Sequence, residues 1–189
     1  NTLGVEDYGI NNVVAGFVSL FGFLNATLSS SIQRFYNFEG AKNGSTGYKQ
    51  VYITAMIIHI IIAAIILVVL ESIGLWYVNK IMVIPDERLN AAKTLFQTSV
   101  ISMLFVLLQI PFIGVIMAKE HMNFYAFTSI IDVLLKLIVV ILFQFIPYDK
   151  LIIYGLLSLS ISIINFILYF GYCKRKFKEI KFEFKYYPI

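Results

Sequence analysis

The sequence predicts an all-α, polytopic membrane helix bundle, and three observations support this fold class. The 189 residues are 59% hydrophobic, 14% charged and have a mean hydropathy of +0.82, whereas soluble domains are about 45–50% apolar and about 25% charged. Apolar segments long enough to cross a bilayer recur along the chain. Polar segments with turn-forming residues separate them. We therefore expect five transmembrane helices, at about 13–32, 51–70, 95–118, 124–146 and 151–173.

The first two expected spans are joined by a polar segment. Residues 1–10 are short and acidic, and span 13–32 follows, with small residues at steps of three and four that permit close helix packing. Asn25 adds a polar group at mid-depth. Residues 35–50 include the turn-forming sequence AKNGSTG, which predicts a loop. Span 51–70 is rich in Ile and is interrupted by Thr54 and His59.

The later spans have recognisable starts and one internal proline. Pro85, followed by Asp86 and Glu87, predicts a helix start, since proline suits the first turn and acidic side chains suit the positive end of the helix dipole. In span 95–118, Pro111 removes a backbone hydrogen bond and predicts a kink. A short turn at 147–150 starts span 151–173, and a basic segment, 174–189, follows.

Span 124–146 carries two ionisable residues near its middle. Asp132 and Lys136 lie four residues apart, so they share one helix face with Tyr125, Thr128 and Ser129, while the opposite face is aliphatic. Because a charge facing lipid costs about 2.5 to more than 10 kcal/mol, we expect this face to line protein or a water-filled cavity. Two interpretations remain open: a self-neutralising pair that fixes the helix rotation, or a substrate or ion contact in a transport cavity.

The distribution of cationic residues predicts the orientation in the membrane. One side of the five-span topology holds ten cationic residues, including Arg34, Lys119 and the basic tail, and the other side holds four. The positive-inside rule then places the C-terminal tail in the cytoplasm and the N-terminal loop outside. The chain begins at Asn1 in a loop, so we expect one further helix before it, which would complete a six-helix lobe.

Three further residues each have a structural and a functional interpretation. His59 is either a neutral, hydrogen-bonded histidine or a candidate for ion coupling. Pro111 is either a structural proline or a hinge for alternating access. Arg34 is either a snorkelling anchor or a contact for an anionic head group. Catalytic and metal-binding patterns are not visible in the sequence, so we expect no enzyme activity, no metal site and no cofactor beyond proton or Na⁺ coupling.

An ordered set of short motifs resembles the bacterial polysaccharide flippases, the Wzx-type O-antigen and capsule transporters. The motifs are LGVEDYGI at 3–10, QRF at 33–35, IPDERLNAA at 84–92, Pro111, and AKEHM at 118–122. The resemblance covers nearly the whole chain and implies membership of the multidrug/oligosaccharidyl-lipid/polysaccharide exporter superfamily. It also implies two six-helix lobes around a central cavity. Residues 1–173 would form the N-terminal lobe without its first helix, and 174–189 would be a cytoplasmic segment leading to the second lobe.

The resemblance also implies a substrate: an undecaprenyl-pyrophosphate-linked oligosaccharide, moved from the cytoplasmic to the external leaflet of the bacterial inner membrane. A pyrophosphate needs cations and a sugar needs amide and hydroxyl partners. The substrate-binding candidates are Lys136, Arg34, Asn25, Gln109, Ser162 and Asn165, and Asp132 would hold Lys136 or couple a proton or Na⁺.

The partners expected on this basis are the lipid-linked oligosaccharide, membrane lipids, a polysaccharide polymerase and glycosyltransferases, but no nucleic acid. Three alternative functions remain open. The chain could belong to a cation-coupled multidrug exporter or a lipid II flippase of the same superfamily, to a membrane-embedded glycan transferase or polymerase, or to a non-transporting scaffold.

Overall fold

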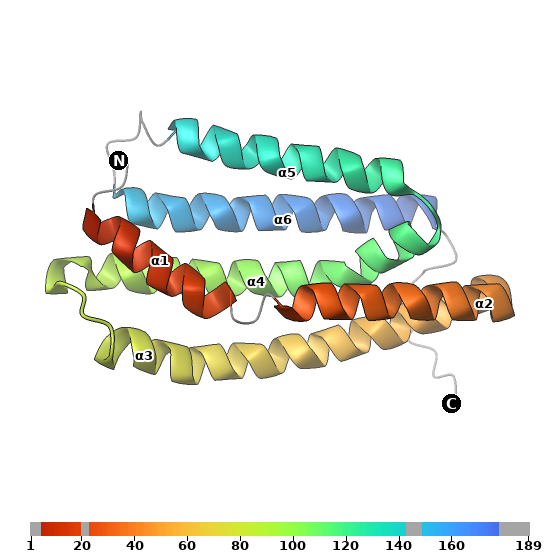
Figure 1. Cartoon of the computed structure of the whole chain (residues 1–189), viewed down its shortest axis with the longest axis horizontal. Coiled ribbons are helices and arrows are strands. Elements are labelled where there is room, and N and C mark those ends of the chain that lie inside the picture. Colours follow the sequence, from red (N-terminus) through yellow and green to blue (C-terminus); the bar gives the residue numbers. More distant parts are fainter. Residues whose placement is uncertain (1–4, 20–22, 143–148, 178–189) are drawn as a thin grey trace.

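The computed structural model describes residues 5–19, 23–142 and 149–177, without the side chains of 5–6, 17 and 23–26. Within these ranges the regular structure is helical and contains no strand, so the predicted all-α helix bundle is confirmed (Figure 1). Its helices are α1 (Val5–Ser19), α2 (Phe23–Val69), α3 (Leu75–Lys80), α4 (Leu89–Ala118), α5 (Met122–Leu142) and α6 (Lys150–Lys176). A π-helical turn, Leu70–Gly74, joins α2 to α3, and a 3-10 turn, Asp86–Arg88, precedes α4.

Four helical segments in the described part are long and apolar enough to cross a membrane: Thr27–Lys80, Asp86–Ala118, Met122–Leu142 and Lys150–Lys176. At a rise of about 1.5 Å per residue, even the 21 residues of α5 reach about 31 Å, the thickness of a hydrocarbon core. The spans predicted at 95–118 and 151–173 lie within α4 and α6. Span 124–146 coincides with α5 as far as Leu142, and residues 143–146 lie outside the described residues.

The loop predicted at 35–50 is wrong, because these residues are helical and α2 forms a hairpin. The backbone of Gly44 has φ 56° and ψ −134°, a conformation open mainly to glycine, and it separates the arms 23–43 and 45–69. Figure 1 shows α2 reversing its direction at its far end. A Cβ on Gly47 would lie 2.2 Å from the backbone oxygen of Glu39, so glycine also permits the close approach of the arms. One glycine in a special conformation therefore replaces the expected loop.

The N-terminal prediction is also corrected. Residues 1–10 were expected to form a loop, whereas α1 already begins at Val5. The expected span 13–32 falls on α1, described as far as Ser19, and on α2, described from Phe23, and residues 20–22 lie outside the described residues. The side chain of Asp7 is 7% exposed and pairs with Arg88, so the acidic segment is packed against the bundle.

Helix α4 is the centre of the bundle, and α5 lies at its edge. Half of the most apolar part of α4 is buried, against 11% for α5, and α4 packs against both α2 and α6. Two glycines permit these contacts. A Cβ on Gly114 would lie 2.7 Å from Ile32 of α2, and a Cβ on Gly155 of α6 would lie 2.3 Å from Thr98 of α4.

Opposite ends of the bundle carry different contacts. At the Arg88 end, the guanidinium of Arg88 donates to Asp149 (2.7 Å) and to Asp7 (2.9 Å), which joins α6 and α1 to the start of α4. At the Lys119 end, the ammonium of Lys119 lies 4.7 Å from the ring centre of Tyr48 in the second arm of α2. The α2 turn and the α4–α5 turn therefore lie at the same end.

Candidate functional site

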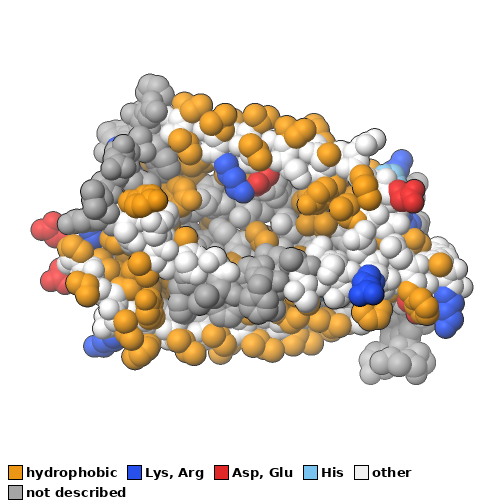
Figure 2. Space-filling view, viewed as in Figure 1, with side chains coloured by type: hydrophobic (Ala, Val, Ile, Leu, Met, Phe, Trp, Pro, Cys, Tyr) orange, Lys and Arg blue, Asp and Glu red, His pale blue; other side chains and the backbone are white. Residues whose placement is uncertain are grey.

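A cavity of about 730 Å³ opens between α4, α5 and α6. Figure 2 shows this face of the molecule hollowed, with a basic and an acidic side chain next to each other at the rim. The polar side chains that line the cavity are Ser102 and Gln109 of α4, Tyr125, Thr128, Ser129, Asp132 and Lys136 of α5, and Tyr154, Ser158, Ser162, Asn165 and Tyr169 of α6. The polar face predicted for the fourth span therefore lines a cavity in the middle of the bundle.

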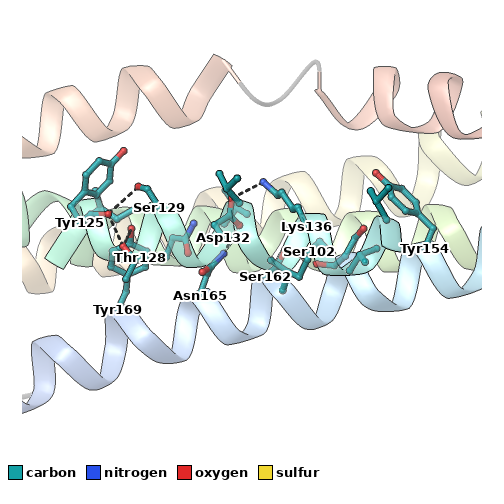
Figure 3. Close-up of a pocket in the computed structure, with 18 residues that line it drawn as sticks. Ser102, Tyr125, Thr128, Ser129, Asp132, Lys136, Tyr154, Ser162, Asn165 and Tyr169 are labelled. Carbon is teal, nitrogen blue, oxygen red and sulfur yellow. Dashed lines mark hydrogen bonds and ion pairs between the residues drawn. The ribbon is translucent and has the colours of Figure 1, made fainter. Parts of the chain in front are cut away.

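Asp132 lies at the centre of this cavity and is held from two helices (Figure 3). The ammonium of Lys136 donates to Asp132 Oδ2, and Asn165 Nδ2 donates to Asp132 Oδ1, both at 2.7 Å. The side chain of Asp132 is 27% exposed and that of Lys136 is 66% exposed. Because an ammonium has three N–H donors, Lys136 keeps donors for a ligand in the cavity.

Two amide oxygens in the cavity wall lack hydrogen-bond partners among the described residues. These are Gln109 Oε1 and Asn165 Oδ1, and both are buried. The orientation of the Asn165 amide follows from its neighbour, since the Asp132 carboxylate accepts and the amide nitrogen must face it. A buried acceptor without a donor costs about 1–3 kcal/mol, so both oxygens suit a ligand that carries N–H, O–H or a positive charge.

Tyrosines mark both ends of the cavity. Tyr125 and Tyr169 lie at one end and Tyr154 at the other (Figure 3). The hydroxyls of Thr128 and Tyr169 are hydrogen-bonded at 2.8 Å, which connects α5 to α6. Along α5 the lining runs from Tyr125 to Val140, about 22 Å at the helical rise. The cavity is therefore elongated, with a charged pair in its middle and aromatic groups at its ends.

Five of the predicted site residues converge on this cavity: Lys136, Asp132, Gln109, Ser162 and Asn165. Arg34 does not join them, because it is exposed on the first arm of α2 and is absent from the lining. His59 lines a different cavity, between the arms of α2. Asn25 belongs to α2, but its side chain lies outside the described residues.

Pro111, the hinge candidate, is buried inside α4, which stays helical through it. Its backbone oxygen accepts a hydrogen bond from the hydroxyl of Tyr36 at 3.3 Å. Figure 1 shows the C-terminal part of α4 turning toward α5. This bend agrees with the predicted kink, and a role as a hinge stays a prediction.

Ser102 and Tyr154 are lining residues that the sequence analysis missed. Ser102 precedes Gln109 by seven residues, and Tyr154 precedes Ser158 by four. Both spacings place residues on the same face of a helix, so extending the polar faces of α4 and α6 by one or two turns would have found them.

Among the residues that the structure describes, no group of three or more His, Cys, Asp or Glu side chains is placed to hold a metal ion. Comparison of the chain with family models, curated proteins and solved structures returned no match. The chemistry of the cavity and the resemblance of the short motifs therefore carry the functional proposal.

Proposed function

We propose that this chain forms part of a transporter that flips an undecaprenyl-pyrophosphate-linked oligosaccharide from the cytoplasmic to the external leaflet by alternating access. The polar cavity halfway along the membrane-spanning helices is the observation that carries this proposal. It combines an exposed cation, Lys136, with two unpartnered amide oxygens, those of Gln109 and Asn165. The resemblance to Wzx-type flippases supplies the substrate class.

Lys136 is the proposed contact for the pyrophosphate. It lies near the middle of α5, where the surrounding lipid has a low dielectric constant and an ion pair with a phosphate is strong. Its bond to Asp132 holds the ammonium in place while leaving 66% of the side chain exposed. A phosphate oxygen approaching through the cavity replaces water at the remaining donors.

The unpartnered oxygens of Gln109 and Asn165 are the proposed contacts for the sugar. Sugar hydroxyls supply the donors that these buried acceptors lack. The hydroxyl of Ser162 donates to the backbone oxygen of Ser158 at 3.2 Å, so its own oxygen is left as an acceptor. The rings of Tyr125 and Tyr154 add apolar faces of the kind that pack on sugar rings.

The open side of the cavity supports a two-lobed transporter. A charged side chain at the middle of a span is costly when it faces lipid, yet Lys136 is largely exposed. A second helix bundle covering this face removes that cost and completes the central cavity. Residues 1–173 then serve as the N-terminal lobe and 174–189 as the cytoplasmic connection to the other lobe, with neither enzymatic activity nor a cofactor required.

The cavity also favours a second candidate, a cation-coupled multidrug exporter of the same superfamily. Asp132, Asn165 and Gln109 line one cavity, and oxygen ligands of the kind that these side chains carry suit Na⁺ or a proton. The same groups allow ion coupling of a flippase.

For the proposed flippase, the location is the bacterial inner membrane, and the partners are a polysaccharide polymerase and glycosyltransferases.

Replacing Lys136 tests the proposal. In the full-length protein, we expect Lys136→Ala to lower surface polysaccharide at least about tenfold, because a charge-assisted hydrogen bond contributes about 1.5–3 kcal/mol. Lys136→Arg should retain export. The matched control is Lys93→Ala on α4, which does not line the cavity, and immunoblots of the membrane fraction establish equal protein levels.

Export by Lys136→Ala at the wild-type level would contradict the assignment. Drug efflux that depends on Lys136, with unchanged surface polysaccharide, would favour the exporter instead.

A further inference from the structure

A second cavity, of about 410 Å³, lies between the two arms of α2. It shares no lining residue with the cavity around Asp132. In Figure 1, α4 lies between α2 and α6, so the two cavities lie on different sides of α4. The polar side chains around this second cavity are Ser31 and Glu39 of the first arm and Gln50, Thr54 and His59 of the second. It is therefore a separate site that needs its own explanation.

The hydrogen bonding of His59 determines the state of its ring. His59 is 1% exposed, and its Nδ1 lies 2.7 Å from the backbone oxygen of Ala55. A carbonyl oxygen only accepts, so Nδ1 must carry the proton of the neutral ring. Nε2 then presents a lone pair, and this buried atom has no partner within the part of the chain that the structure describes. The neutral ring therefore has a free hydrogen-bond acceptor at Nε2.

Polar groups connect His59 with the Lys119 end of the bundle. Glu39 and Gln50 lie on either side of the turn at Gly44, Thr54 follows Gln50 by one helical turn, and His59 lies about one turn deeper. Four residues of helix advance about 6 Å, a gap that one or two water molecules bridge. At about 30 Å³ per water, the cavity has room for about a dozen.

Few charged groups face this site. Glu39 is the other ionisable residue among those that line the cavity. Helix α4 packs against α2 and has no ionisable side chain between Lys93 and its end. In the adjoining π-helical turn, Glu71 accepts a hydrogen bond from Gln97 at 3.0 Å.

The buried tyrosines of α2 face α4 instead. The hydroxyl of Tyr36 bonds to Pro111, and the ring of Tyr52 lies 5.7 Å from that of Phe112. Among the described residues, Glu39 is therefore the acidic side chain that shares this cavity with a positive charge on His59, and the arms of α2 would have to adjust around that charge.

We propose that His59 is a proton-binding site, loaded at Nε2 by hydronium that enters the cavity between the arms from the Lys119 end. The lone pair of Nε2 takes the proton, one water molecule is released, and the positive charge is shared over the imidazolium ring. Nδ1 keeps its proton and its bond to Ala55 throughout. The proposal does not depend on which substrate the Asp132 cavity carries.

The test uses the full-length protein in lipid nanodiscs with ¹⁵N-labelled histidine. Variants of His59 and His121, for example His59→Gln, assign the signals of these two histidines. At high pH, we expect His59 to show the tautomer with hydrogen on Nδ1, and on acidification its signal should change to imidazolium. His121, which bonds to the hydroxyl of Tyr172 at 2.8 Å, reports in every sample that the fold is intact.

A matched pair of substitutions tests the route of entry. Ser31→Leu fills the cavity, whereas Ser30→Leu makes the same change at the adjacent exposed residue outside it. We expect Ser31→Leu to slow hydrogen exchange at the His59 ring about tenfold, because it displaces the water of the cavity, and Ser30→Leu to leave the rate unchanged.

Three outcomes would overturn the proposal: a His59 signal that never becomes imidazolium, the opposite tautomer at high pH, or equal exchange rates in the two Leu variants. Wild-type export by Lys136→Ala, which would contradict the proposed substrate contact, would affect none of these readouts.

Discussion

Asp132 shows how much of the site depends on one side chain. Its carboxylate accepts from Lys136 on the same helix and from Asn165 on α6, 33 residues away in sequence. The first bond follows from a spacing of four residues on a helix. The second depends on how α5 lies against α6, and no local pattern contains that information. A sequence therefore reveals a pair within one helix and leaves the third member to the packing.

Glu120 has a positive φ angle of 60°, and among the described residues it is the non-glycine residue with this backbone conformation. It ends α4 in a Schellman motif, in which His121 N donates to Ile116 O at 2.9 Å and Glu120 N donates to Met117 O at 3.1 Å. This backbone conformation costs a residue with a side chain about 1 kcal/mol or more, and glycine is the usual residue there.

We expect Glu120→Gly to raise the free energy of unfolding by about 1 kcal/mol, because glycine relieves this backbone strain. Thermal unfolding followed by circular dichroism measures the change. Asn123→Gly, three residues later in the first turn of α5, should give no gain. A lower stability of Glu120→Gly would show that the glutamate side chain contributes more than the backbone strain costs.

At the scale of helices, close contacts depend on particular glycines. The small residues of the first expected span predicted close packing, yet a Cβ on Gly16 would meet nothing within 4 Å. Close contacts between helices lie instead at Gly114 of α4, beside Ile32 and Tyr36 of α2, and at Gly155 of α6, beside Leu95 and Thr98 of α4. Small residues permit close packing, and the arrangement of the helices decides which of them are used.

We expect Gly155→Ala to destabilise the bundle by about 1–3 kcal/mol, since the added methyl group would overlap Thr98 and press on Leu95 of α4. Thermal unfolding of the purified protein measures this loss. Gly171→Ala in the same helix is the matched control, because a Cβ there meets nothing within 4 Å, and it should be neutral or stabilising. Equal stability of the two variants would contradict the close contact between α4 and α6.

Arg88 is the residue that ties three helices together at its end of the bundle. Arg88→Ala removes two charged hydrogen bonds, and we expect a loss of about 1–3 kcal/mol. Hydrogen exchange should rise most in α1, because Asp7 loses a bond that holds α1 to α4. Lys93→Ala, one turn into α4, should leave exchange in α1 unchanged. Unaltered protection of α1 in Arg88→Ala would show that apolar packing alone holds this helix.

At the scale of the whole molecule, the charges divide between two ends. The α2 turn with Lys42 and Lys49, the α4–α5 turn with Lys119, and the basic end of α6 lie at one end. Arg88, with the starts of α4 and α6, lies at the other. This separation agrees with the predicted topology. The long helices α4 and α6 therefore run between a strongly basic end and an end with internal ion pairs.

We expect the Lys119 end to face the cytoplasm, because basic loops stay on that side of the membrane. Single cysteines introduced by Lys42→Cys and Lys80→Cys, in a chain whose own Cys173 is replaced by Ser, test this orientation. Both lysines are exposed, at opposite ends. A membrane-impermeant maleimide should label the cysteine at position 80 in intact cells and the one at position 42 after lysis. The reverse pattern would invert the topology.

Local sequence was enough for the helical membrane class, the end of α4 at Ala118, the start of α6 to within one residue, the helix start at Asp86, and the pairing of Asp132 with Lys136. Each of these depends on hydropathy or on spacing along a single helix, which the local sequence contains. The sequence did not predict the hairpin of α2, because the backbone conformation of one glycine, Gly44, makes the turn where a loop was expected.

Which of the candidate residues come together depends on how the helices pack. This packing brought Gln109, Ser162 and Asn165 to the charged pair, left Arg34 outside, and gave His59 a cavity of its own. It also joined Asp7 and Asp149 through Arg88. These contacts connect residues far apart in the chain, so they depend on how complete helices pack against one another. Side-chain volumes and glycine contacts along whole interfaces set that packing, and a short motif does not record it.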